Sequence, residues 1–541
     1  MAVVSVPTLL SALVPVTFLY FVALAIYRVY FHPLAKYPGP LLAKLTQWPE
    51  ARSAWQGRRF LNLHLMHEKH GDVVRFAPDK LSFRTTGALR DIYADRRANV
   101  IKTGWTYAGL RINPGITTQT LSDRQLHAAR RKLLNNAFAE GALKNLEKYV
   151  VANIRDWCNH LGEAKDGDEK EPGWGKERDL GLWSTLLTFD VLGDLCFGSS
   201  FDAMKNGFTY IQELILSSSS FQQSIAFLPI RELVFPLMKP KILLLTGNKN
   251  IKQKVMYRQQ IGVLVQKRFA LENANADKAD ELQRKDFFHH LLNAKDPETG
   301  EKFKPTDLVG EAALLVGAGA DTSSTAMSAC FFYLMRTPRA LSRLQEQVRS
   351  AFDDVEEIRY GAKLTGLAYL RGCIDEAMRM SPPVPGLLDR QVLPGGANID
   401  GHTIPEGMVV GVPTYSIHHN EKYYPRPYEF LPERWIAGSD SLVTGFDVTP
   451  ESVEKAKSAF NAFSSGPRNC VGKNMAYMEL FVAIARTMWL FDIRLKEGDH
   501  TGEGRPELGL GREKPGEYQL TDWLISERHG PVLEFRKRTI S

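Results

Sequence analysis

Apolar residues fill the first part of the chain almost without interruption. No Asp, Glu, Lys or Arg precedes Arg28, and residues 6–27 are nearly all apolar. About 20 such residues in a helix cross the core of a bilayer. Positive charge follows on one flank only, at Arg28, Lys36 and Lys44. By the positive-inside rule, this pattern predicts a single membrane span with the rest of the chain in the cytosol.

A cleaved signal peptide is the alternative, because Ala23-Leu24-Ala25 matches the small-residue cleavage pattern. The missing positive n-region and the length of the apolar run favour an anchor. Residues 31–40 then hold three prolines and a glycine, which cannot continue a helix. We therefore expect a membrane anchor over residues 1–30, a proline-rich hinge over 31–42 and a globular body over 43–541.

In the body, helical periodicity is frequent and strand-like alternation is sparse. The clearest helical stretches are 126–138, 146–157 and 341–352, and the strand-like ones are 72–84 and 395–412. Polar stretches at 162–178 and 272–284 indicate surface loops or frayed helix ends. Length alone would allow roughly three or four domains. Because no repeat or shift in composition divides the body, we predict one large domain that is mainly α with small β-sheets.

The stretch 312–335 is apolar and long enough to suggest a second membrane span. Its centre carries Asp321 and a run of hydroxyl side chains, which are costly in a bilayer. We therefore predict a long helix through the core of the body, where small residues let a flat group approach the backbone. Gly317-Ala318-Gly319 is also a fragment of a dinucleotide fingerprint, but the third glycine is missing, so a nucleotide-binding fold is disfavoured.

The composition is that of an ordinary globular protein, with 44% hydrophobic and 24% charged residues. It excludes a disordered, collagen-like or multi-span membrane chain. A net charge of +7 spread over 541 residues does not indicate nucleic-acid binding. The five cysteines are scattered and form no C-x-x-C pair, so neither a disulfide scaffold nor a zinc ribbon is expected.

The most informative segment runs from Phe463 to Gly472 and places Cys470 between glycines and after Arg468. Such a loop can present a thiolate to a metal, because glycines allow close backbone approach and N–H groups stabilise the anionic sulfur. Arg468 can pair with a carboxylate on a bound group. The ordinary alternative is a buried cysteine that only packs.

This segment resembles the haem-binding loop of the cytochrome P450 family, F-x-x-G-x-R-x-C-x-G, and all five fixed positions match. They are Phe463, Gly466, Arg468, Cys470 and Gly472. The resemblance implies the P450 fold and haem b with Cys470 as the axial thiolate on iron. It also implies that Arg468 binds a haem propionate and that Phe463 shields the sulfur.

Two further segments resemble the family's structural landmarks. Glu376-Ala377-Met378-Arg379 is similar to its E-x-x-R helix, and residues 430–435 are similar to its P-E-R-F segment with Trp435 in place of Phe. Other E-x-x-R pairs occur at Glu281/Arg284, Glu346/Arg349 and Glu356/Arg359. The apolar neighbours of Glu376 and the prolines after it select this pair. The resemblance implies a buried structural triad of Glu376, Arg379 and Arg434.

Residues 318–323 match the family's [AG]-G-x-[DE]-T-[TS] segment, which fits the predicted core helix. The resemblance implies that Gly319 opens a groove over the haem and that Asp321 and Thr322 handle O₂ and protons. Family members that rearrange peroxides without activating O₂ often lack this pair. Its presence therefore favours monooxygenation.

His127 and Arg131 are four residues apart and share one face of a predicted helix. They resemble the family's W-x-x-x-R, with His in place of Trp, which implies two further propionate donors. The alternative for His127 is a surface position among basic neighbours. Arg390 lies where the family often places another propionate-binding residue. The other four cysteines match no motif and are expected to be ordinary: Cys158, Cys196, Cys330 and Cys373.

The resemblance implies a microsomal monooxygenase that inserts one oxygen atom from O₂ into an apolar small molecule. The anchor, the hinge at residues 31–34 and the residues around Cys470 are similar to those of microsomal enzymes of filamentous fungi. Such enzymes often act on terpenoid, polyketide or aromatic intermediates. Electrons from NADPH are expected through a separate reductase, with cytochrome b5 as a second donor, because the ~70 residues after Cys470 are too few for a flavin domain. The expected location is the endoplasmic reticulum membrane, single-pass, with the catalytic domain cytosolic.

Two other functions stay open: a haem-thiolate isomerase or dehydratase without O₂ activation, and a haem sensor or carrier. The Asp321-Thr322 pair argues against both. For the reductase, docking through Arg130, Lys132 and Lys473 competes with ordinary solvated charge. By resemblance, the substrate is expected to contact 104–119, Leu314, Gly317, Ala318, 384–387 and 518–521. The apolar stretch 221–245 is expected to dip into the membrane or to pack in the core.

Overall fold

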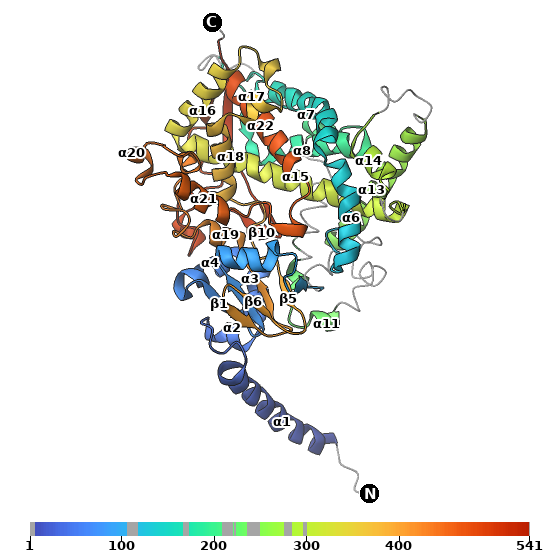
Figure 1. Cartoon of the computed structure of the whole chain (residues 1–541), viewed down its shortest axis with the longest axis vertical. Coiled ribbons are helices and arrows are strands. Elements are labelled where there is room, and N and C mark those ends of the chain that lie inside the picture. Colours follow the sequence, from blue (N-terminus) through green and yellow to red (C-terminus); the bar gives the residue numbers. More distant parts are fainter. Residues whose placement is uncertain are drawn as a thin grey trace.

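The computed structural model describes residues 6–104, 117–165, 173–207, 220, 223–234, 249–274, 284–295 and 300–539. The body is built mainly from helices, with small sheets at its lower and upper ends in Figure 1, and helix α1 projects away from it. This arrangement confirms the prediction of a mainly α fold with small β-sheets.

The described helices are α1 (Val6–Ile26), α2 (Leu41–Leu45), α3 (Trp48–Trp55), α4 (Arg59–His70), α5 (Thr86–Leu89), α6 (Arg124–Ala137), α7 (Glu140–Leu161), α8 (Leu180–Phe197), α9 (Ala203–Asn206), α11 (Arg231–Val234), α13 (Lys249–Ala274), α14 (Phe287–Asn293), α15 (Pro305–Arg336), α16 (Pro338–Ala351), α17 (Ala362–Thr365), α18 (Ala368–Met380), α19 (Thr414–His418), α20 (Ser441–Thr444), α21 (Pro450–Ala459) and α22 (Lys473–Leu490). The predicted helices 126–138, 146–157 and 341–352 correspond to α6, α7 and α16.

The described strands are β1 (Val73–Ala77), β2 (Lys80–Phe83), β3 (Val100–Lys102), β4 (Arg178–Asp179), β5 (Arg390–Val392), β6 (Ala397–Ile399), β7 (His402–Ile404), β8 (Val409–Gly411), β9 (Phe491–Leu495), β10 (Thr521–Trp523), β11 (Ile525–Glu527) and β12 (Val532–Lys537). The largest sheet has the order β1-β2-β8-β5-β3, in which only β2 and β8 run parallel. The other described sheets are a three-stranded one, β4-β12-β9, and the two-stranded hairpins β6-β7 and β10-β11.

Helix α15 runs through the centre of the body, as predicted for residues 312–335. Its residues from Ala320 to Leu334 are almost all buried, and α8 packs along it. Gly319 makes this packing possible, because an added Cβ would lie 2.8 Å from Leu192 Cδ1 on α8. Among the described residues, α8 is also apolar enough to span a membrane, but 83% of it is buried, which identifies a core helix.

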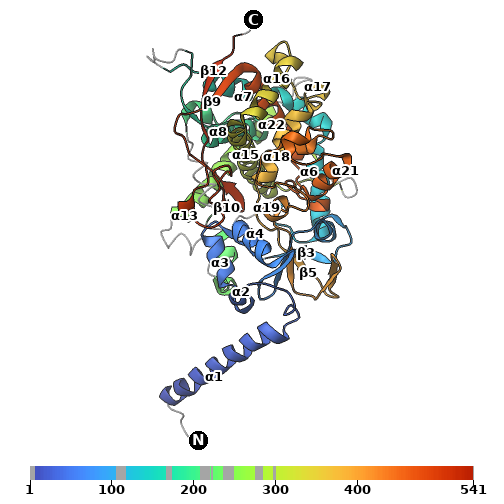
Figure 2. The same ribbon diagram turned by 90° about the vertical axis from the view of Figure 1, so that its left-hand side faces the viewer.

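The N-terminal helix differs sharply from α8. Residues Leu13–Phe31 have a mean hydropathy of 1.7 and none of them is buried, and Figure 2 shows α1 extending away from the body. The proline-rich segment that follows is docked on the body. Leu34 and Tyr37 lie in its core, and the backbone N–H of Arg75 donates to Pro38 O at 2.7 Å. The Arg75 guanidinium also donates to Arg28 O at 2.8 Å, so Arg75 holds the chain both before the prolines and at Pro38.

A buried ionic network ties α18 to the 3₁₀ turn Pro432–Trp435. Glu376 accepts hydrogen bonds of 2.9 Å from the guanidinium groups of Arg379 and Arg434. Burial would raise the pKa of Glu376, but the two arginines outweigh it and lower the pKa. The indole N–H of Trp435 also donates to Glu376 at 2.9 Å, a hydrogen bond that the phenylalanine usual at this position cannot make.

Candidate functional site

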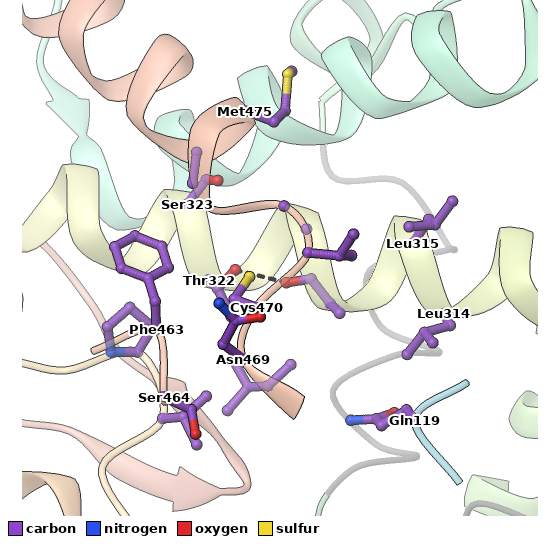
Figure 3. Close-up of a pocket in the computed structure, with 18 of the residues that line it drawn as sticks. Gln119, Leu314, Leu315, Thr322, Ser323, Phe463, Ser464, Asn469, Cys470 and Met475 are labelled. Carbon is purple, nitrogen blue, oxygen red and sulfur yellow. Dashed lines mark hydrogen bonds between the residues drawn. The ribbon is translucent and has the colours of Figure 1, made fainter. Parts of the chain in front are cut away.

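A cavity of about 330 Å³ lies between α15 and the loop that carries Cys470. Figure 3 shows Phe463, Ser464, Asn469 and Cys470 on this loop, which crosses beside α15 and continues toward Met475 on α22. Of the residues expected to bind a cofactor, those whose side chains border the cavity are Phe463, Arg468, Cys470, His127, Arg131 and Arg390. Segments far apart in the chain therefore converge on one cavity.

The Cys470 loop turns back on itself before α22. The backbone N–H of Cys470 donates to Phe463 O at 2.9 Å, and Gly472 is the N-cap of α22. The Cys470 residue is exposed, but desolvation by the surrounding protein raises the pKa of its thiol, while the Gly472 N–H and the charges of Arg131 and Lys473 act to lower it. A backbone N–H group that lowers the thiol pKa is present, as expected from the sequence, but desolvation has the larger effect and the pKa is raised. A bound metal cation would supply the missing positive charge, because metal coordination deprotonates a thiol.

Gly466 is required by close backbone packing. Its φ is +70°, and an added Cβ would lie 2.0 Å from Tyr93 O. That backbone oxygen belongs to a π-helical turn, Arg90–Ala94, against which the loop rests. The glycine thus supports the loop from behind and lies outside the set of described residues that border the cavity.

Two arginines hold the loop against α6 and the residues just before it. Arg468 donates to the backbone oxygens of Leu121 at 2.6 Å and Ser122 at 2.8 Å. Arg131 donates to the backbone oxygen of Asn469 at 2.6 Å and to its side chain at 2.8 Å. Both guanidinium groups remain at the cavity wall. His127, one turn before Arg131 on α6, is buried, so the surface alternative for it is wrong.

Five basic side chains from β3, α6, β5 and the loop gather at this wall: Lys102, His127, Arg131, Arg390 and Arg468. Burial and, to a smaller extent, the surrounding cations together lower the pKa of His127 to about 3. Burial also lowers the pKa of Lys102 well below its usual value, with Arg390 and Arg468 adding to the effect. Basic groups therefore cluster at this wall, where Lys102 Nζ also donates to Gln119 O at 2.6 Å.

Lys102 is a cofactor-site candidate that the sequence reasoning missed. It is the last residue of a three-residue strand, which has no signature of its own. The pairing of β3 with β5 places Lys102 directly opposite Arg390. Like charges directly opposite each other on paired strands are destabilising. A bound anion between them would turn this repulsion into binding energy.

The residues present fit haem. The cavity has one thiol at its wall and a concentration of cations suited to the two propionates of the porphyrin. Within the described ranges, no group of three or more His, Cys, Asp or Glu side chains is placed to hold a metal ion alone. Cys470 would therefore bind an iron whose other ligands come from the macrocycle.

We expect Lys102→Met to bind haem about tenfold more weakly, because one hydrogen bond to a charged group is lost. The measurement is the rate of haem transfer from the holoprotein to an excess of a haem-accepting protein. Lys457→Met, which removes an exposed lysine in an i,i+3 pair, is the matched control. Equal transfer rates for Lys102→Met and the wild type would contradict the assignment.

The α15 wall of the cavity carries the predicted oxygen-handling segment. Gly319, Thr322 and Ser323 are among the described residues that border the cavity, but Asp321 is not. The Thr322 hydroxyl donates to Ala318 O at 2.6 Å. Asp321 is buried on another side of the helix, and burial raises its pKa to about 6.

Glu479 on α22 also borders the cavity and was missed by the sequence reasoning. It is buried, its Oε1 has no hydrogen-bond partner in the described structure, and Ser323 hydrogen-bonds to the carboxyl. Burial raises the pKa of Glu479 to about 8. A single glutamate in the apolar stretch after Cys470 was the available signal.

The rest of the cavity wall is mainly apolar. Leu314, Ala318 and Val384 border it as expected, whereas Gly317 is not among the described residues that do. The expectation for 518–521 needs correction, because Leu524 and Ile525 take that place. The hairpin β10-β11 reverses at Leu524, where φ is 74°, so its turn enters the wall.

Other expectations fall partly outside the described residues. Of 104–119, residues 105–116 are not described, and of 221–245 only 223–234 are. Within the latter, Phe227 is buried beside Arg59, while Leu233 is exposed. The four cysteines expected to be ordinary are buried, and no disulfide occurs among the described residues.

The predicted docking role of Arg130 does not agree with its place in the structure. Its guanidinium pairs with Asp307 at 2.5 Å and with Glu311 at 3.5 Å, and only 18% of the side chain is exposed. Glu311 in turn accepts the backbone N–H of Thr118 at 2.6 Å. Arg130 therefore joins α6, α15 and the segment before α6. Lys473 stays exposed beside the Phe463 ring.

Comparison with known proteins gives consistent matches over nearly the whole chain. The family model for cytochrome P450 matches residues 35–519. "Cytochrome P450 monooxygenase fscF" of Fusarium equiseti is 36% identical over 538 residues, covering 98% of this chain and 96% of the relative. "Cytochrome P450 monooxygenase apf7" of Gibberella fujikuroi is 35% identical, with 96% of each covered. "Trichothecene C-15 hydroxylase" of Fusarium sporotrichioides is 31% identical, covering 92% of this chain and 94% of the relative.

Proposed function

The chain belongs to the cytochrome P450 family, and from this premise we propose how its own residues serve oxygen insertion. Family and relatives identify a haem-thiolate monooxygenase similar to enzymes of fungal secondary metabolism. The observation that carries the proposal is that Cys470 and Thr322, from different elements, border the same cavity.

Haem ligated by a thiolate supplies, when bound, the one-electron and O₂ chemistry of the site. Cys470 would hold its iron, and the propionates would be bound by Lys102, Arg131, Arg390 and Arg468, with His127 as a neutral donor beside them. The low pKa of His127 supports its role as an uncharged hydrogen-bond donor at neutral pH. Phe463 packs beside Tyr477, with ring centroids 5.1 Å apart, and would keep water from the sulfur.

Thr322 and Asp321 would handle the protons. The Thr322 hydroxyl is held by Ala318 O on the preceding turn and so presents its oxygen to the cavity. Asp321 would take up a proton from solvent and pass it toward Thr322 Oγ1 through water. A carboxyl whose pKa lies near 6 can both accept and release a proton close to neutral pH.

The substrate would be a lipophilic small molecule. Leu314, Ala318, Leu388, Leu524 and Ile525 give the cavity an apolar wall around a few polar groups. The chemistry of the relatives supports a fungal secondary metabolite as the substrate class. Electrons would come from NADPH through a separate reductase, with cytochrome b5 as a second donor, and Lys473 remains a candidate for the docking face.

The chain would be anchored in the endoplasmic reticulum membrane, with residues 43–541 in the cytosol as the catalytic domain. Helix α1 (Val6–Ile26) would lie within the anchor, residues 1–30, and residues 31–42 would connect the anchor to the body. Exposed apolar side chains continue past the anchor onto the first helices of the body: Phe31 73%, Leu41 62%, Leu42 62%, Trp48 54% and Trp55 73%. Such a surface supports contact between this end of the body and the lipid headgroups.

We expect Thr322→Ala to keep consuming NADPH while product formation falls about tenfold or more, because a proton donor at the cavity is lost. The measurement compares NADPH oxidation, hydrogen peroxide release and product, with purified reductase and a panel of lipophilic fungal metabolites. Ser328→Ala, two turns further along α15, removes a buried hydroxyl that bonds to Ser324 O and is the control.

Tight coupling of NADPH use to product in Thr322→Ala would contradict the proton role. A wild-type enzyme that oxidises no NADPH with reductase and converts no member of the panel would contradict monooxygenation of this substrate class. That second result would instead favour a haem-thiolate isomerase or a haem carrier.

A further inference from the structure

A buried arginine lies between α8 and α15, outside the site described so far. Arg528 follows β11 and is only 8% exposed. Its guanidinium donates to Thr185 Oγ1 on α8 at 2.6 Å and to Ser324 Oγ on α15. Both partners are neutral hydroxyls, and among the described residues no carboxylate lies within ion-pair distance of it. An arginine buried without a direct counter-ion is costly, so its charge calls for an explanation.

The carboxyl group that this charge acts on is Asp321. Ser324 lies three residues after Asp321, so Arg528 reaches α15 within one turn of the proton-handling residue. Burial raises the pKa of Asp321, Arg528 opposes this rise, and Glu527 adds to it. Arg528 is thus the cation that counteracts the burial of Asp321.

Other elements that pack on α15 bring different groups. Helix α22 contributes Glu479, whose raised pKa keeps its carboxyl protonated at neutral pH. Helix α18 contributes Glu376 and Arg379, which pair with each other. Helix α8 contributes hydroxyls, including Thr188, which donates to Ala320 O at 3.0 Å.

Arg528 is also mechanically connected to the substrate side of the cavity. It follows directly on the hairpin β10-β11, whose turn residues Leu524 and Ile525 border the cavity. The hairpin is pinned from two sides: Ser526 N–H donates to Pro383 O at 2.9 Å, and the Thr325 hydroxyl donates to Ser526 O at 3.3 Å. These hydrogen bonds hold the cavity-lining turn and Arg528 in one fixed arrangement with α15.

We propose that Arg528 is a positioning residue that keeps the Asp321 carboxylate charged and ready to accept a proton, and that the β10-β11 hairpin holds Arg528 in place for this role. The inference rests on the proposed role of Asp321. The proton passes from solvent to an Asp321 carboxylate oxygen and from there toward Thr322 Oγ1. Arg528 gains and loses no proton in this step.

The direct test is an infrared pH titration of the full-length holoenzyme. The carboxylic acid band that is absent from Asp321→Asn belongs to Asp321, and in the wild type it should titrate near pH 6. In Arg528→Gln the midpoint should rise by about one pH unit, because a nearby opposite charge is lost. Arg528→Lys retains the charge and should shift the midpoint much less. An unchanged midpoint in Arg528→Gln overturns the inference.

A second variant guards against misfolding of Arg528→Gln. Glu527 is partly exposed and accepts the indole N–H of Trp523 at 2.7 Å, so Glu527→Gln keeps that hydrogen bond. Removing its negative charge should move the Asp321 midpoint downward. A midpoint that responds to neither neighbour shows that the hairpin does not control Asp321.

The functional test needs no identified substrate. With reductase, NADPH and O₂ alone, the ratio of NADPH to O₂ consumed separates reduction to water, at two NADPH per O₂, from reduction to hydrogen peroxide, at one NADPH per O₂. At pH 7, Arg528→Gln should shift this ratio toward peroxide as Asp321→Asn does, and the double variant should be no worse than Asp321→Asn alone.

The two possible failures give different results. If Asp321→Asn leaves the NADPH-to-O₂ ratio unchanged, the proposed proton role of Asp321 is wrong. If Asp321→Asn shifts the ratio but Arg528→Gln shifts neither the ratio nor the infrared midpoint, Arg528 only packs between α8 and α15. The Soret band of the carbon monoxide complex, recorded for every variant, confirms that haem and its thiolate ligand remain.

Discussion

Cys470→Ser should abolish oxygen insertion and remove the red-shifted Soret band that the reduced carbon monoxide complex shows with a thiolate ligand. A serine hydroxyl is a far weaker metal ligand than a thiolate and donates less electron density to iron. We expect product formation to fall below detection, which is the largest effect that any single substitution should have here. The measurements are the carbon monoxide difference spectrum and reductase-supported turnover.

Cys158→Ala is the matched control for this experiment. Cys158 is buried in α7, and burial raises the pKa of its thiol to about 12, so it is an inert packing group at neutral pH. The control should keep the spectrum and the activity. A Cys470→Ser protein that still shows the thiolate-type band would mean that another group ligates the iron and would remove the assignment of this loop.

Glu376→Gln should produce the second-largest effect, on folding rather than on chemistry. The amide can accept some of the hydrogen bonds made to Glu376, but it cannot neutralise Arg379 and Arg434. Breaking a buried ionic network by removing one partner costs about 3–5 kcal/mol. Since a domain is stabilised by only about 5–15 kcal/mol in total, much of the protein should fail to fold or to take up haem. Thermal unfolding and haem content per polypeptide measure the loss.

Glu454→Gln provides a control with the same substitution and the same i,i+3 spacing. Glu454 pairs with Lys457 at 2.7 Å on the surface of α21, where 71% of its side chain is exposed. Exposed pairs contribute little to stability, so this variant should melt close to the wild type. Similar losses in the two glutamate variants would show that the buried network carries no special share of the stability.

The haem loop could be predicted from the sequence because its chemistry needs fixed residue types at fixed spacing. Thiol, glycines and arginine lie within ten positions, and each has a separate physical reason. Glu376 and Arg434 could be paired because each lies in its own recognisable segment. The predicted core helix at 312–335 followed from a physical argument against placing Asp321 and its hydroxyl neighbours in lipid.

Other parts of the site depend on contacts that no local pattern reveals. Lys102 becomes part of the site only because β3 pairs with β5, which is nearly 290 residues away in the chain. Trp435 looked like a conservative aromatic exchange, yet its indole N–H reaches Glu376. Arg130 looked like surface charge, yet α15 supplies carboxylates for it.

Helix geometry explains the separation of Asp321 from the cavity. Neighbouring residues on an α-helix point about 100° apart, and the α15 face that borders the cavity carries Ala318, Gly319, Thr322 and Ser323 but not Asp321. The sequence places them side by side, and only the packing of α15 decides which one borders the cavity. The charged residues that act on Asp321, Arg528 and Glu527, come from the C-terminal end of the chain.

Because the proline-rich segment is docked on the body, the orientation of the body would follow that of α1 in a bilayer. Because Leu34 and Tyr37 are buried in the body and Arg75 hydrogen-bonds to the backbone oxygens of Arg28 and Pro38, the segment after α1 is docked on the body and is not a flexible tether. A membrane span that is too long for its bilayer relieves the mismatch by tilting. With α1 as the membrane anchor, a tilt of α1 would rotate the body as well, and membrane thickness would then set the height and angle at which the enzyme meets lipid-dissolved compounds.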